Sequence, residues 1–197
     1  LAALCLHTEF SPLPGLTFRE SLYNGVASDR INRQFRFCPR SDGMFNIGSL
    51  SYHIGEEDRH HGYYAVGYAL GSSPSETSAD KTFNYALWTL IEQPLLHVGE
   101  SHLGAMWQGG TSPASRSTCR HYWGAGLIWS NIPPRMTQVG LVVNRALYAD
   151  GRETDVELTG SFPVCNHFTL QPAVHCINTN GNYTAAAQLR AILEFGN

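Results

Sequence analysis

Alternation of apolar and polar side chains near the C-terminus is the feature that most restricts the fold of this chain. Along residues 154–162, Val156 and Leu158 alternate with Asp155 and Glu157. Successive side chains of a β-strand point to opposite faces, so such a segment has one apolar and one polar face. The pattern predicts a β-sheet that separates an apolar environment from an aqueous one.

Ten strands are expected from alternation, aromatic content and the turn-forming residues between segments. They cover residues 16–24, 45–54, 63–70, 84–93, 103–108, 121–129, 138–146, 154–162, 168–177 and 185–195. An eleventh, poorly defined strand is expected near residues 7–10. No segment has a convincing helical period, and Gly or Pro interrupts most windows long enough for one. The sequence predicts an all-β, antiparallel fold in one domain over residues 1–197.

Composition narrows the class of protein. Charged residues make up 15% of the chain, against about 25% in a typical soluble domain. The chain has no apolar run long enough for a membrane-spanning helix, which needs about 18 residues or more. With a formal charge of −3, it has no net positive field to attract nucleic acid. These values suit a Gly-rich soluble β-protein or a transmembrane β-barrel.

The lengths of the connections favour the barrel. The connections at residues 163–167 and 178–182 are short, whereas those at 71–81 and 109–118 are longer and rich in Ser, Gly and Pro. Short turns on one rim and longer loops on the other are typical of transmembrane barrels. Trp and Tyr residues, including Trp88 and Tyr122, are expected to form the interfacial girdles of such a barrel, although β-propensity alone also explains many of them.

The alternation also fits a soluble fold. A closed barrel pairs every backbone N–H and C=O, with the apolar face toward hydrocarbon and the polar face toward water inside. A soluble β-sandwich or a lipocalin-like binder with one wet face shows the same pattern. Both interpretations remain open from periodicity alone.

Residues 153–177 (ETDVELTGSFPVCNHFTLQPAVHCI) contain an acid-x-x-x-Glu-Leu strand, a short turn and an aromatic-x-Leu-Gln-Pro strand. This segment resembles the penultimate hairpin of the OprB-like family of carbohydrate-selective porins. LWTLIEQPLL and WGAGLIWSN are similar to the "acid-Gln" and "GAGL" strands of the family, and LTFRESLYNG and SDGMFNIGSLSYHIG to earlier strands. The similar segments occur in order and cover most of residues 12–195.

The resemblance implies a wide outer-membrane barrel of a Gram-negative bacterium that passes sugars by diffusion and binds them weakly. Family members are about twice as long and form barrels of about 16 strands, so the resemblance covers their C-terminal half. They usually end on an aromatic residue, whereas Gly196 and Asn197 follow Phe195 here. We therefore expect part of a longer protein, a reduced barrel, or a half-barrel whose missing strands come from a partner chain.

The odd or even position of a residue along its strand decides its face, and the polar face is expected to line the water-filled interior. There, Arg, Glu and Gln side chains exchange hydrogen bonds with the hydroxyl groups of a sugar. The candidate saccharide-binding residues are Gln108, Glu157, Gln171, His175, Gln188 and Arg190, with Ser49, Ser51 and His53 as weaker candidates. Each of them could equally line water without selecting a solute.

A basic run in one connection consists of Arg30, Arg33, Arg36 and Arg40. Folded inward, this run would form a constriction that favours neutral or anionic solutes. Folded outward, it would be a solvated loop or a contact with lipopolysaccharide. The sequence does not decide between the two.

The sequence gives no reason to expect catalysis, a cofactor or a metal. It has no GxSxG or comparable nucleophile motif. Acidic and histidine residues cluster at His53 and within 56–61, but they lie in an expected connection, and metal sites need fixed geometry. The leading hypothesis is passive diffusion of sugars and other small solutes and ions through an outer-membrane channel. The alternative is a structural scaffold within a larger outer-membrane complex, derived from a porin half-barrel without free transport.

Overall fold

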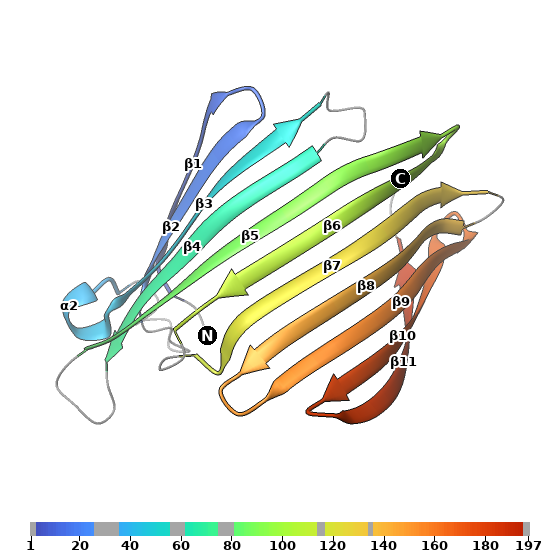
Figure 1. The fold of residues 1–197 in the computed structure, drawn as a ribbon. Coiled ribbons are helices and arrows are strands. Elements are labelled where there is room, and N and C mark those ends of the chain that lie inside the picture. Colours follow the sequence, from blue (N-terminus) through green and yellow to red (C-terminus); the bar gives the residue numbers. More distant parts are fainter. Residues whose placement is uncertain are drawn as a thin grey trace.

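A single antiparallel sheet of eleven strands forms the body of the protein in the computed structural model (Figure 1). The structure describes residues 3–25, 36–55, 62–74, 81–113, 117–133 and 136–194. Strands adjacent in sequence are adjacent in the sheet. The strands are β1 (Cys5–Leu13), β2 (Leu16–Asn24), β3 (Met44–Ile54), β4 (Gly62–Pro74), β5 (Lys81–Val98), β6 (Ser101–Thr111), β7 (Cys119–Ile132), β8 (Met136–Tyr148), β9 (Arg152–Cys165), β10 (Phe168–Thr179) and β11 (Asn182–Leu193). A four-residue helix, α2 (Pro39–Asp42), lies between β2 and β3.

The predicted all-β antiparallel fold is confirmed, including all ten predicted strands and the eleventh near residues 7–10, which is β1. Most strands extend beyond their predicted limits. β5 has 18 residues, more than the roughly 9–11 that cross the hydrocarbon of a bilayer. It continues through Pro94, where the register with β6 shifts between Pro94 and Leu96. The irregular pairing accommodates a residue that has no N–H to donate.

Hairpin turns follow the chemistry of their residues. β10 and β11 are joined at Asn180 and Gly181, whose φ angles are 54° and 96°. Two consecutive positive φ values are the pattern of a type I′ turn, for which Asn-Gly is strongly preferred. The prediction that short turns and long loops lie on separate rims is only partly right. The short turns after β9 and β10 are consecutive and therefore lie at opposite ends of the sheet.

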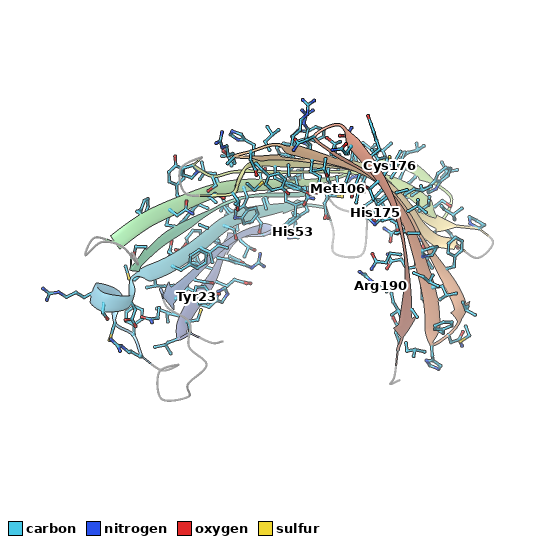
Figure 2. The ribbon with its side chains drawn as sticks, turned by 90° about the horizontal axis from the view of Figure 1, so that it is seen from below. Tyr23, His53, Met106, His175, Cys176 and Arg190 are labelled. Atoms are coloured by element: carbon cyan, nitrogen blue, oxygen red, sulfur yellow. The ribbon has the colours of Figure 1, made fainter. Side chains whose placement is uncertain are left out.

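The sheet curves into an arch with a concave and a convex face (Figure 2). β1 and β11 form its two edges and do not pair with each other. The outer backbone groups of these strands have no partner strand within the described sheet. The structure is therefore the wall of a barrel, open along one side.

The described residues contain almost no conventional hydrophobic core. The buried apolar residues are Ala65 and Ala173. By contrast, Leu158, Val174 and Leu189 are 54%, 55% and 66% exposed. No second layer covers these side chains in the described part of the chain, as a soluble sandwich would require. No helix in the same residues is long and apolar enough to cross a membrane.

Candidate functional site

Cross-strand pairing assigns each side chain to one face of the sheet, because directly paired residues share a face. His175 pairs with Glu157, and Gln171 pairs with Arg190. Figure 2 shows His175 and Arg190 on the concave side of the arch, and Cys176 on the other side. The polar residues of β9 to β11 therefore share one wall, opposite the exposed apolar residues of the same strands.

When the cross-strand pairs are followed from β11 to β3, the predicted saccharide-binding residues all lie on the concave face. These are Gln108, Glu157, Gln171, His175, Gln188 and Arg190, together with Ser49, Ser51 and His53. They are spread over several strands and do not form a single cluster. Their role in binding saccharides stays a prediction.

Salt bridges and hydrogen bonds organise the concave face of β1 to β3. Arg19 Nε lies 2.7 Å from Glu9 Oε2, and Arg19 Nη1 donates to Ser51 Oγ at 3.5 Å. Ser51 is only 1% exposed, so it supports Arg19 and does not itself reach the interior space. His7 Nδ1 and Ser21 Oγ are 2.7 Å apart.

The arginine run is only partly described. Arg30 and Arg33 lie outside the described residues. Arg36 is held beside α2, because its Nε lies 3.4 Å from Asp42 Oδ2 and its Nη2 donates to Ser41 Oγ at 3.0 Å. A side-chain hydrogen bond to Cys38 and the nearby Asp42 carboxylate raise the pKa of the Arg36 guanidinium. α2, which carries Arg40, lies outside the arch in Figure 2, so the structure does not bring this helix over the concave face.

A hollow of about 610 Å³ on the concave face was not predicted. Its floor is formed by small residues of β4 to β6, and Trp88 and Tyr122 contribute aromatic rings. A Cβ atom on Gly67 would lie 2.3 Å from the Trp88 indole, so the glycine allows the ring to lie against the sheet. Arg120 also lines the hollow, and its buried Nε has no hydrogen-bond partner among the described residues.

The sequence signal for this hollow was a run of small residues at alternate positions. The small residues in its lining include Ala69, Gly71, Ala86 and Gly110. Trp88 and Tyr122, assigned to the interfacial girdles from sequence, instead lie on the concave face. The sequence of one strand does not show which residue of the next strand pairs with an aromatic side chain. The position of the hollow could therefore not be predicted.

A hydrogen-bonded ladder crosses β6, β7 and β8 beside the hollow. Gln108 Nε2 donates to Tyr122 Oη at 2.6 Å, and Tyr122 Oη donates to Asn144 Oδ1 at 2.8 Å. The side chains meet over Gly124, where an added Cβ would lie 2.4 Å from Asn144 Oδ1 and 3.0 Å from Gln108 Nε2. This ladder fixes the predicted residue Gln108 in place.

An acid–histidine cluster occupies the concave face of β9 and β10. His175 Nδ1 lies 3.1 Å from Asp155 Oδ2, and ligand atoms of Asp155, Glu157 and His175 all lie within 4.8 Å of one another. Asp155 Oδ1 is buried and has no hydrogen-bond partner within the described part of the chain. Sequence analysis assigned Glu157 and His175 to this wall separately but did not predict that they meet.

A polar cluster interrupts the convex face near the middle of β2. Glu20 accepts hydrogen bonds from Tyr68 Oη at 2.9 and 3.1 Å, and from Asn46 Nδ2. An added Cβ on Gly48 would lie 2.3 Å from the Glu20 carboxylate. A carboxylate on an apolar surface is costly unless it is hydrogen-bonded, and these donors offset part of that cost.

Comparison with known proteins supports the architecture at the level of fold. No protein-family model matches the chain, and no curated protein sequence matches it. A solved structure titled "High pH structure of Pseudomonas putida OprB" matches with a TM-score of 0.74 and 14% sequence identity. The match covers 95% of this chain and 57% of that chain. The chain thus has an OprB-like porin fold and spans a little over half the length of the protein it matches.

Proposed function

We propose that this chain forms part of the wall of a bacterial outer-membrane channel that passes sugars and other small solutes by passive diffusion. The observation that carries the proposal is the division of a single-layered sheet into an exposed apolar convex face and a polar concave face. Hydrocarbon suits the convex face, and a water-filled passage suits the concave face.

Solute passage needs only weak, exchangeable contacts on the concave wall. Arg190, Gln188 and Glu157 offer hydrogen-bond donors and acceptors to hydroxyl groups. At the hollow, several strands away, the Trp88 ring offers an apolar platform, and the Arg120 side chain also lines it. No catalytic step and no cofactor is part of this function.

The open edges require further strands in the working channel. Unpaired N–H and C=O groups facing hydrocarbon cost several kcal/mol each. Strands pairing with β1 and β11, from the same polypeptide or from a partner chain, would satisfy these groups. The outer surface of the completed barrel would contact the lipid bilayer and lipopolysaccharide.

Liposome swelling driven by sugars of increasing size tests the transport function, using the assembly purified from outer membranes. The wild-type assembly should admit monosaccharides faster than larger sugars. Trp88→Ala should alter the rates for sugars, because Trp88 lies on the concave face. Trp107→Ala is the matched control, because Trp107 lies on the convex face and is 38% exposed.

Two results would contradict transport. The first is an assembly that incorporates into liposomes but shows no sugar-dependent swelling and no conductance in planar bilayers. The second is an equal change in sugar rates for the Trp88 and Trp107 variants, which would place the solute path elsewhere.

A scaffold within a larger outer-membrane complex is the second candidate function. The open edges favour it, because β1 and β11 are free to pair with a partner protein that fills the channel. Co-purification of such a partner in fixed stoichiometry, with no conductance, would support the scaffold. Recovery of a conducting barrel built from this polypeptide alone would exclude it.

A further inference from the structure

The acid–histidine cluster on β9 and β10 has the composition of a transition-metal site. Asp155 and Glu157 are two positions apart on β9, so their carboxylates share the concave face. His175 is the direct cross-strand partner of Glu157. Imidazole nitrogen and carboxylate oxygen are both ligand types that bind Zn²⁺ in proteins.

One carboxylate oxygen lacks the partner that its burial demands. Asp155 Oδ2 lies beside His175, but no described residue offers a hydrogen-bond partner to the buried Asp155 Oδ1. A buried acceptor left unsatisfied costs roughly 1–3 kcal/mol, and more when it is charged. A cation bound at Asp155 Oδ2 would neutralise the carboxylate and so lower that cost. It would also balance the charge of the two carboxylates, which lie near a single histidine.

We propose that Asp155, Glu157 and His175 bind one Zn²⁺ ion on the concave wall. Zinc–ligand bonds of about 2.0–2.2 Å separate tetrahedral ligand atoms by roughly 3.4 Å. The His175–Asp155 pair at 3.1 Å is already near that spacing, and all three ligand atoms lie within 4.8 Å of one another. Small changes of side-chain rotamer would bring all three ligand atoms to this spacing. A water molecule would occupy the fourth coordination position of the ion, which faces the interior. This site does not depend on the transport of sugars.

Zinc binding by the purified assembly tests the site. The assembly in detergent is stripped with a chelator, and Zn²⁺ binding is then measured by equilibrium dialysis. The wild type should bind one ion per chain with high affinity. Asp155→Asn and His175→Gln should each weaken that binding at least about 100-fold, the upper end of the loss caused by removing a supporting group.

His7→Ala is the matched control, because His7 also lies on the concave face but contacts Ser21. It should bind Zn²⁺ as the wild type does. Co²⁺ bound to the wild-type assembly provides a test that needs no variant. Its visible absorption should show tetrahedral coordination by nitrogen and oxygen ligands.

Several outcomes would overturn the site. They are no stoichiometric Zn²⁺ binding by the wild type, unchanged affinity in the two ligand variants, or an equal loss in His7→Ala. Circular dichroism and heat-modifiable migration in gels identify variants that no longer fold. If both ligand variants misfold, an octahedral all-oxygen Co²⁺ spectrum of the wild type would still refute the proposal.

Discussion

The two faces of β9 to β11 are built from the same three strands but carry side chains of opposite character. On the convex face, Val174 and Leu189 are exposed apolar residues with no protein layer over them. On the concave face, His175 and Arg190 find partners across the strands, in Asp155 and Gln171. Neighbouring residues one position apart thus lie in different surroundings, one on an exposed apolar face and one in a polar network. The apolar Val174 is more exposed than the polar His175 beside it, the reverse of the order in a soluble core. The face of the sheet, not burial in a core, therefore determines which kind of residue stands at each position.

Substitutions of Leu189 and Gln188 test most directly whether the two faces differ in their tolerance of a charge. Leu189→Arg should destabilise the protein in lipid by about 2–4 kcal/mol, because it places a charge on the surface that faces lipid in the proposed channel. Gln188→Arg, its sequence neighbour on the concave face, should be nearly neutral. Free energies of unfolding in urea, measured in lipid vesicles, provide the comparison. Equal tolerance of both substitutions would mean that the two faces do not meet different solvents.

Glu20 is a charged residue on the otherwise mostly apolar convex face, and its hydrogen bonds can be tested by substitution. Tyr68→Phe removes the hydroxyl that donates to the carboxylate, and it should cost roughly 1.5–3 kcal/mol, the range for hydrogen bonds to charged groups. Tyr52→Phe is the control, because Tyr52 is 45% exposed on the same face. The measurement is again unfolding in vesicles. Losses of similar size in the two variants would show that the Glu20 contacts add no stability.

Gly124 tests the concave face. Gly124→Ala should push Asn144 and Gln108 away from Tyr122 and cost about 1–2 kcal/mol for two hydrogen bonds. Gly104→Ala is the matched control in the neighbouring strand, because its new Cβ would meet nothing closer than 3.6 Å. If Gly104→Ala destabilises the protein as much as Gly124→Ala, the loss reflects the strand backbone and not the ladder.

The smallest expected effect is a change in the ion selectivity of the assembly. Gln188→Arg adds a positive charge to the concave wall, and such a charge acts on an ion in water with about 1 kcal/mol or less. The reversal potential of the assembly across a salt gradient should shift modestly toward anion selectivity. Leu189→Lys is the control and should leave it unchanged wherever that variant folds. A shift of the same size in both would argue against a water-filled concave side.

Sequence patterns predicted the strands well where alternation is strict. In β9, Val156 and Leu158 against Asp155 and Glu157 fix both the element and its two faces. The prediction stopped short where residues with poor β-propensity continue a strand. β5 runs on past Gln93 through Pro94, and β6 continues through Gly109 and Gly110. Pairing with neighbouring strands there outweighs local preference.

The candidate site was less predictable, because it depends on register between strands. Parity within a strand assigned Glu157, His175 and Arg190 to the concave face. It could not show that Asp155 joins the first two, since that requires the pairing of β9 with β10. The hollow at Trp88 was missed for the same reason, because the position of the Trp88 ring against Gly67 follows from the pairing of β4 with β5.

The number of strands limits what can close the barrel. Every neighbouring pair in the sheet is antiparallel, so with eleven strands, β1 and β11 run in the same direction. A second copy with the same membrane orientation would meet these edges in two parallel seams. Fully antiparallel closure instead needs an odd number of added strands, the first running against β11 and the last against β1.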